Sequence, residues 1–114
     1  MPKNSRNKGA RGEVELAREL ARVLGCRARR GQQYSGSPES PDVITDIPCL
    51  HIECKRTETL RLYDALAQSA RDAAAGEVPV VMHRRNRGKW IVVAELDRLP
   101  ELAANITHFL DKRD

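Results

Sequence analysis

Two short segments of the sequence contain residue types that together can cleave a phosphodiester bond. Pro41-Asp42 is followed, after a gap of ten residues, by Glu53-Cys54-Lys55. The second segment ends a largely apolar stretch that predicts a strand, in which alternate side chains point to opposite faces. Glu53 and Lys55 therefore share a face that is turned away from the core. With Asp42 on a neighbouring strand, a carboxylate pair suited to a hard divalent cation would lie beside an ammonium group, as metal-dependent phosphodiester hydrolysis requires.

The acid and lysine alone are weak evidence, because such a pair on a strand is often an exposed ion pair of little energetic value. A third acid, Glu13, strengthens the interpretation, since it lies on the core-facing stripe of a predicted helix. Glu13 is either a first-turn acid favoured by the helix dipole or a carboxylate directed into a cleft. His51 shares the predicted face of Glu53 and is a weaker candidate for contact with the site.

The basic residues favour a polyanionic partner. The net charge is +4, with twenty Lys and Arg against sixteen Asp and Glu. Most of the basic residues are arginine, whose planar guanidinium suits phosphate oxygens. A solvated surface with no binding role is the alternative, but the clustering favours nucleic acid over a membrane. The candidate DNA-binding residues are Lys3, Arg6, Lys8, Arg11, Arg29, Arg30, Arg56, Arg84, Arg85, Arg87 and Lys89.

Several classes of protein are disfavoured by composition. The three cysteines show no Cys-x-x-Cys spacing, so neither a disulfide framework nor a zinc site is indicated. No apolar run approaches the ~18 residues of a membrane span, and the first residues do not form a secretory signal. We therefore expect a cytoplasmic protein (in the host cytoplasm if phage-encoded), with no membrane partner and no small-molecule cofactor.

The elements that must position these residues form one α/β (α+β) unit. Residues 1–9 predict a flexible basic arm, and residues 10–114 a single domain with a central mixed sheet of about five strands flanked by helices. The predicted order is αβββαββα, with Val23 and Leu62 among the residues expected on the buried helix stripes. The predicted helices are 11–24, 60–75 and 99–110, and the predicted strands are 26–31, 42–46, 49–56, 78–83 and 90–95.

Glu13, Pro41-Asp42 and Glu53-x-Lys55, in this order, resemble the motif of the PD-(D/E)XK nuclease superfamily. The α-β-β-β-α-β core of that superfamily, the restriction-endonuclease-like fold, matches the predicted order of elements. More narrowly, the segment 8–16, Gly36-Ser37 and Pro41-Asp42 are similar to the archaeal-type Holliday junction resolvases and their phage relatives. The resemblance covers roughly residues 8–95.

The resemblance implies a set of site residues and a cofactor. Asp42, Glu53 and the backbone carbonyl of Cys54 would ligate Mg²⁺, with Mn²⁺ as a substitute and one or two ions per site. Glu13 would complete the acidic cluster, and Lys55 would orient the attacking water and stabilise the developing charge. Ser37 matches a serine that assists near the scissile phosphate. Gln68 matches a polar helix position beside the site.

The resemblance also implies branched DNA as partner, with four-way junctions resolved by paired symmetric nicks during recombination and repair. Symmetric cleavage requires two active sites, so a homodimer is expected. Pro38 and Glu39 depart from the plainer loop of many resolvases, and the connection 55–62 resembles phage enzymes more than archaeal ones. The DNA structure preference is therefore open. A nuclease acting on flaps, forks or duplex DNA and a non-catalytic DNA-binding module are the alternatives.

Overall fold

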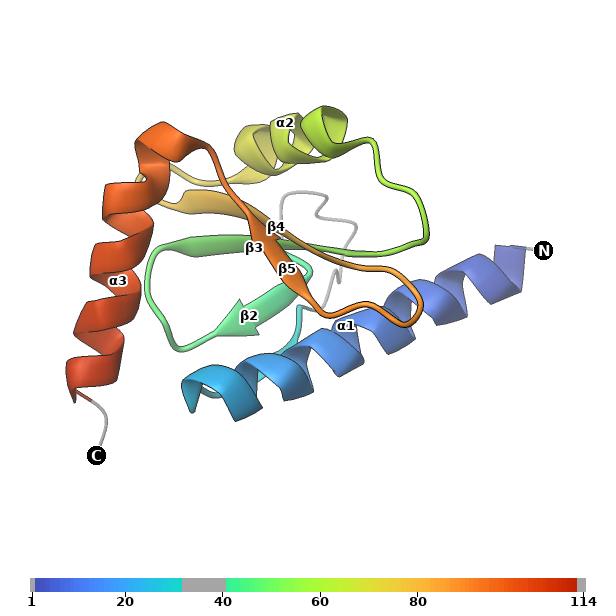
Figure 1. Ribbon diagram of the computed structural model, residues 1–114, viewed down its shortest axis with the longest axis horizontal. Helices are drawn as coiled ribbons and strands as arrows, with labels where there is room; N and C mark the ends of the chain where they lie inside the picture. Colours follow the sequence, from blue (N-terminus) through green and yellow to red (C-terminus); the bar gives the residue numbers. More distant parts are fainter. Residues whose placement is uncertain (1, 32–40, 113–114) are drawn as a thin grey trace.

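The computed structural model describes residues 2–31 and 41–112, with side chains from residue 9 onward. Helix α1 (Pro2–Leu24) covers one face of a five-stranded sheet, α2 (Leu62–Asp72) covers the other, and α3 (Leu99–Lys112) lies at one end (Figure 1). This confirms the α+β class, the mixed sheet and the order αβββαββα. The strands are β1 (Ala28–Arg30), β2 (Val43–Thr45), β3 (Leu50–Arg56), β4 (Val78–Arg84) and β5 (Ile91–Val93), with a short 3₁₀ turn, η2 (Leu96–Arg98), before α3.

The strands lie side by side in chain order, β1-β2-β3-β4-β5. Among the described strands, β3 and β4 pair in parallel, whereas β1–β2, β2–β3 and β4–β5 pair antiparallel. A parallel pair needs a crossover connection, and α2 supplies it between β3 and β4. This crossover places α2 over β3 and β4, while α1 packs across β1, β2 and β3 on the opposite face.

Because helices cover both faces of β3, its central residues His51, Ile52 and Glu53 are buried on both faces of the sheet. The sequence prediction turned His51 and Glu53 away from the core, whereas the two residues are only 0% and 4% exposed. Helix α2 packs on this second face, where Ser69 Oγ donates hydrogen bonds to the backbone oxygens of His51 and Val80. Glu53 therefore lies in a medium of low dielectric constant.

Helix α1 begins at Pro2 rather than near Arg11, so the backbone of residues 2–9 is helical and the predicted boundary is wrong. Proline favours the first turn of a helix because its φ angle is already helical and the missing N–H has no intrahelical acceptor there. Gly9 and Gly12 each weaken a helix by about 1 kcal/mol relative to alanine but do not end it. The prediction began the helix at Arg11 because the polar, basic segment before it carries no apolar period. The second helix is shorter than expected, ending at Asp72 rather than near Ala75.

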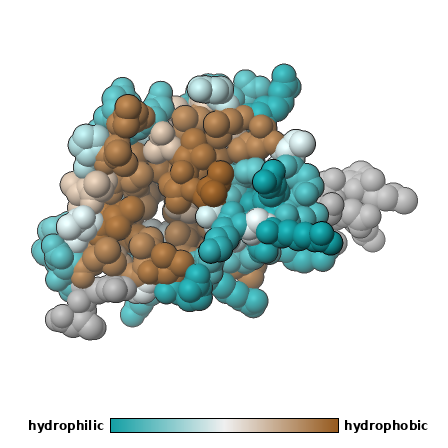
Figure 2. Space-filling model, viewed as in Figure 1, coloured by the Kyte–Doolittle hydropathy of each residue, from teal (hydrophilic) through white to brown (hydrophobic). Residues whose placement is uncertain are grey.

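Apolar side chains gather between α1, β5 and α3, as the brown area of Figure 2 shows. They line a cavity of about 210 Å³ into which Val23 faces, and Val23 is 58% exposed rather than buried. Leu62, at the first turn of α2, is also exposed, because the helix packs on the sheet only from Ala65 onward. Within the described ranges, no helix combines the length and apolar character needed to cross a bilayer.

Candidate active site

The backbone of Asp42 is held between two strands. Its N–H donates to the carbonyl of Ile52 at 2.9 Å, and its own carbonyl accepts from the N–H of Gly31 at 2.8 Å. Gly31 is required by this close approach, because a Cβ there would lie 2.0 Å from the Pro41 carbonyl oxygen. The Asp42 carboxylate then reaches across to β3, where Oδ2 accepts the backbone N–H of Cys54 at 2.8 Å. The hydrogen bond from the Cys54 N–H thus holds the Asp42 side chain against β3, as the sequence predicted.

The carboxyl groups of Asp42 and Glu53 are close enough to share a proton. Burial, the negative charge of Glu53 and a hydrogen bond to Glu53 raise the pKa of Asp42 to about 7, although the Cys54 N–H acts in the opposite direction. Burial alone would raise the pKa of Glu53 too. Hydrogen bonds from His51 and Asp42, with the charges of His51 and Lys55, outweigh burial and lower that pKa. Asp42 therefore takes up a proton at a higher pH than Glu53 does.

A half-buried carboxylate beside a buried one fits a divalent cation, which would offset the repulsion between their two negative charges. The donors are hard oxygen atoms, which suit Mg²⁺ or Mn²⁺. The structure therefore fits the ion that the sequence implied at Asp42 and Glu53. The carbonyl of Cys54, the third expected ligand, stays a prediction, since the described contact of Cys54 with Asp42 is made by its N–H.

Glu13 lies beside this pair without joining it. Its Oε1 accepts from Arg30 Nε at 2.8 Å, and its side chain is 18% exposed. The negative charge of Glu13 contributes to the raised pKa of Asp42. Within the described residues, however, the only three acidic, histidine or cysteine residues with ligand atoms within 4.8 Å of one another are His51, Glu53 and Asp72. The expected convergence of three acids therefore involves Asp42 and Glu53 directly and Glu13 at longer range.

The remaining sequence-predicted residues are positioned unequally. Lys55 is half-buried near Glu53, and its positive charge lowers the pKa of that carboxyl. Gln68 is half-buried on α2 and makes no hydrogen bond to the carboxylate pair within the part of the chain that is described. Ser37 lies outside the described residues. Burial and the neighbouring acids raise the pKa of the Cys54 thiol to about 12, so the thiol stays protonated.

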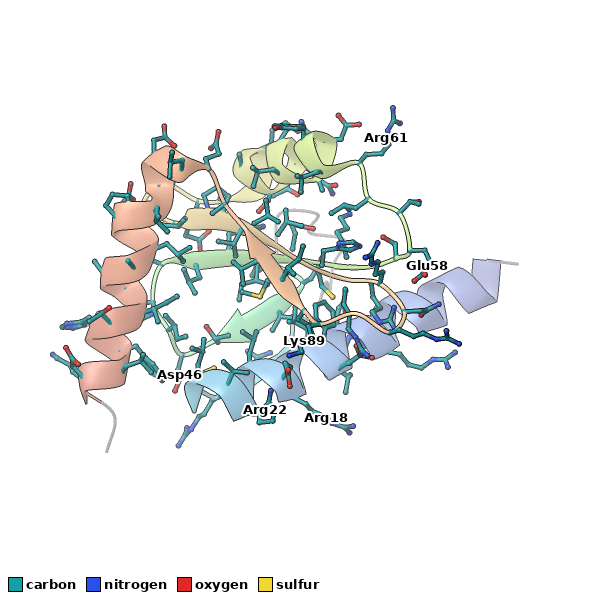
Figure 3. All side chains as sticks on the ribbon, in the orientation of Figure 1. Arg18, Arg22, Asp46, Glu58, Arg61 and Lys89 are labelled. Carbon is teal, nitrogen blue, oxygen red and sulfur yellow. The ribbon has the colours of Figure 1, made fainter. Side chains whose placement is uncertain are left out.

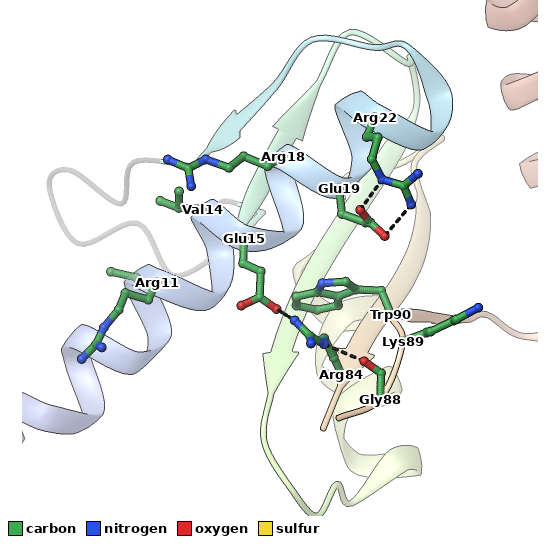
Figure 4. A pocket seen from close by; sticks show the side chains of 11 residues that line it. Arg11, Val14, Glu15, Arg18, Glu19, Arg22, Arg84, Gly88, Lys89 and Trp90 are labelled. Carbon is green, nitrogen blue, oxygen red and sulfur yellow. Dashed lines mark hydrogen bonds and ion pairs between the residues drawn. The ribbon is translucent and has the colours of Figure 1, made fainter. Parts of the chain in front are cut away.

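A groove between α1 and the β4–β5 hairpin is lined by several basic side chains, among them Arg18, Arg22 and Lys89 (Figure 3). Its volume is about 880 Å³. In Figure 4 the Trp90 ring lies between the Glu19–Arg22 ion pair and Arg84. We call this the basic groove; its residues are Ala10, Arg11, Val14, Glu15, Arg18, Glu19, Arg22, Arg84, Gly88, Lys89 and Trp90.

The basic residues divide into free and paired cations. In the described segments, Arg11, Arg18 and Lys89 form no ion pair. Glu15 pairs with both Arg56 and Arg84, and Glu13 pairs with Arg30. Arg29, Arg85 and Arg87 are exposed, and the side chains of Lys3, Arg6 and Lys8 lie outside the description.

Sequence reasoning missed the contributions of Arg18, Arg22 and Trp90 to this groove. The helical spacing could have indicated Arg18 and Arg22. Arg18 lies four residues after Val14 and Arg22 lies eleven residues after Arg11, and both spacings place the residues on the same side of a helix. Trp90 carried no signal, since its place beside α1 depends on how the hairpin folds back over the sheet. Asp72 and Glu77, which lie near His51, were missed for the same reason.

A carboxylate pair with an adjacent lysine, where two neighbouring strands of a mixed sheet meet, is typical of a nuclease core of the PD-(D/E)XK class. Residues 4–111 match the family described as phage putative PDDEXK endonuclease. The chain belongs to this family, and it is a nuclease by that membership. The expected superfamily is thereby confirmed.

The structure is also similar to that of Hjc, a Holliday junction resolvase from the archaeal hyperthermophile Archaeoglobus fulgidus. The TM-score is 0.57 at 29% sequence identity, over 76% of this chain and 72% of that protein. No curated protein matches the chain. The comparisons therefore establish the fold and membership of a PD-(D/E)XK endonuclease family.

Proposed function

We propose that the protein is a Mg²⁺-dependent endonuclease that selects branched DNA and resolves four-way junctions by paired symmetric nicks. The observation that carries the proposal is the Asp42–Glu53 pair, in which a half-buried and a buried carboxyl group lie close enough to raise the pKa of Asp42 to about 7 and together suit a divalent cation. The likeness to an archaeal Holliday junction resolvase supports the choice of substrate.

Each residue of the site has a separate role in this proposal. Asp42 gives up its proton and, with Glu53 and the Cys54 carbonyl, holds Mg²⁺ or Mn²⁺ in one or two positions. A bound cation polarises the phosphate and lowers the pKa of water. Lys55 orients the attacking water and stabilises charge that develops on the phosphate. Glu13 adds negative charge beside the pair, and Ser37 and Gln68 assist near the scissile phosphate.

The basic groove is proposed to position DNA by its backbone. Arg11, Arg18 and Lys89 are the unpaired cations of this groove within the described residues, so they are available to phosphate oxygens. Phosphate contacts fix the register of a nucleic acid without reading its sequence. Such contacts suit an enzyme that recognises the shape of DNA.

Paired nicks require a second active site, and each chain supplies one carboxylate pair. We therefore propose that the active form on a four-way junction is a homodimer with two-fold symmetry, which matches the symmetry of the junction. Flap, fork or duplex cleavage would use the same residues and would not require this dimer.

A panel of labelled substrates tests the choice of DNA. The full chain is incubated with Mg²⁺ and a mobile four-way junction, a 5′ flap, a fork or a plain duplex, at equal concentration. The proposal expects nicks at symmetric positions on opposite strands of the junction and slower cutting of the other substrates. Preferred cleavage of flaps or forks would select the alternative nuclease activity. Binding without cleavage of any substrate would select the non-catalytic module.

A further inference from the structure

A histidine buried among three acidic side chains lies on the α2 side of the sheet. His51 on β3 is fully buried, and Glu53 on the same strand is 4% exposed. Asp72 ends α2, and Glu77 precedes β4. Ligand atoms of His51, Glu53 and Asp72 lie within 4.8 Å of one another. Among the described residues, no Lys or Arg forms an ion pair with Glu53, Asp72 or Glu77, so one imidazole faces three carboxylates.

The spacing between His51 and Glu53 fits two ligands of one ion. His51 Nε2 lies 3.4 Å from Glu53 Oε1. This distance is long for a hydrogen bond between charged groups, which is usually about 2.7–2.9 Å. Two ligands held at 2.0–2.1 Å in a tetrahedral geometry are separated by roughly 3.4 Å. The observed separation thus matches the edge of a metal coordination sphere.

The other ring nitrogen of His51 faces a carboxylate, as it does in many metal sites. Nδ1 is fully buried, has no hydrogen-bond partner among the residues that the structure describes, and lies 3.5 Å from Glu77 Oε1. The backbone N–H of Ala74 holds that same oxygen at 2.8 Å. A histidine that ligates a metal usually donates its second N–H to a carboxylate. Binding of a cation at Nε2 fixes the ring proton on Nδ1, where Glu77 can accept it.

We propose that His51 Nε2 and the carboxylates of Glu53 and Asp72 form a second cation site, selective for first-row transition-metal dications such as Zn²⁺ or Mn²⁺. An imidazole nitrogen among the donors favours these ions, whereas Mg²⁺ prefers oxygen donors. Glu77 is the positioning residue that orients His51. The site shares Glu53 with the proposed Mg²⁺ site but does not depend on cleavage of DNA.

Titration of the full chain with Co²⁺, monitored by visible absorption, tests the second site. Excess Mg²⁺ is present throughout so that the oxygen-only site at Asp42 is occupied. One equivalent of Co²⁺ is expected to bind and to resist displacement by Mg²⁺. The variant His51→Gln should weaken Co²⁺ binding by more than about tenfold. The control His108→Gln, which changes an exposed histidine of α3, should leave binding unchanged.

Two further variants keep the test decisive if His51→Gln does not fold, as judged by circular dichroism. Asp72→Asn changes a half-buried ligand at the end of α2, with the exposed Asp64→Asn on the same helix as its control. Asp72→Asn should weaken Co²⁺ binding by more than about tenfold, and Glu77→Gln by about 10–100-fold at unchanged stoichiometry.

Several results would overturn the proposal: displacement of Co²⁺ by Mg²⁺, equal binding by Asp72→Asn and the wild type, or loss of binding in His108→Gln. Each of these results leaves the nuclease proposal untouched. Conversely, wild-type protein that binds Co²⁺ as expected but cleaves no DNA removes the nuclease proposal alone.

Discussion

The ionisation of Asp42 in the folded protein differs strongly from its behaviour in an unfolded chain. Burial and the charge of Glu53 raise its pKa to about 7, from a reference value of 3.8. Between these two values the folded protein binds more protons at this residue than the unfolded chain does. The contribution of Asp42 to stability therefore falls as the pH rises from about 4 to 7 and levels off above that range.

In the metal-free protein, the variant Asp42→Asn should remove this decrease of stability with rising pH. Its amide oxygen can still accept the Cys54 N–H, but no charge develops beside Glu53. We expect the variant to be more stable than the wild type at pH 8, by on the order of 2 kcal/mol, and similar to it at pH 4. Denaturant unfolding in the presence of a chelator measures both values.

The exposed residue Asp64 supplies the control for this comparison. Asp64→Asn should follow the wild-type pH profile. Parallel profiles for Asp42→Asn and the wild type would mean that Asp42 ionises normally in the folded chain, and the proposed cation site would lose its electrostatic basis.

At the residue scale, the sequence indicated the chemistry better than the geometry. Asp42, Glu53 and Lys55 could be selected because their spacing along two predicted strands is a local property. The pairing of Glu13 with Arg30 and the burial of His51 could not be predicted. Both depend on which helix covers which face of the sheet, and that packing involves residues far apart in the sequence.

At the scale of elements, two glycines allow the close approaches that bring the acidic residues together. A Cβ at Gly12 on α1 would lie 2.7 Å from Arg56 Cβ on β3, and one at Gly31 would meet the Pro41 carbonyl. Among the described residues, nothing lies within 4 Å of a Cβ at Gly9, one helical turn before Gly12. Gly12 and Gly31 therefore set the positions of α1 and of Asp42 relative to β3.

Alanine substitutions at Gly12 and at Gly9 should change the stability of the protein in opposite directions. Gly12→Ala should destabilise the protein by about 1–3 kcal/mol, because α1 must move away from β3. Gly9→Ala, its matched control, should be neutral or stabilising by up to about 1 kcal/mol, because alanine favours a helix. Thermal unfolding of both variants measures the difference. Equal effects would show that α1 does not pack closely on β3 at Gly12.

The sequence predicted the identity and order of the elements, since each is a local periodic pattern with its own turn residues. It failed at the start of α1, where a polar, basic segment carried no apolar period although its backbone is helical. It also failed for Val23, because the pattern of one helix does not reveal that α3 leaves a cavity beside it. These errors concern packing between elements rather than the elements themselves.

At the scale of the whole molecule, the basic groove and the carboxylate pair are separate sites. The groove lies between α1 and the β4–β5 hairpin, and the pair lies at Asp42 and β3. Residues of the groove such as Arg18 are expected to act on DNA affinity, and those of the pair on cleavage. Arg18→Ala should weaken binding of duplex DNA uniformly across sequences. It should also reduce the slope of log K against log salt concentration by about 0.9 for each phosphate that the variant no longer neutralises.

Fluorescence anisotropy at several salt concentrations measures this slope. Arg85→Ala and Arg87→Ala, at the exposed hairpin tip, should behave in the same way as Arg18→Ala. Lys112→Ala removes a charge at the end of α3 instead and should leave the slope unchanged. The assignment of the groove to DNA would fail if Arg18→Ala and Lys112→Ala had the same slope as the wild type.

The most direct test of the nuclease account is cleavage of a labelled four-way junction by the wild type, Glu53→Gln and Glu58→Gln in Mg²⁺. Glu58 is exposed and lies just beyond β3, so Glu58→Gln controls for the loss of one acidic charge. The account predicts that the wild type and Glu58→Gln cut the junction, that a chelator stops both, and that Glu53→Gln binds the junction without cutting it. Undiminished cleavage by Glu53→Gln, or cleavage by the wild type in the presence of the chelator, would contradict it.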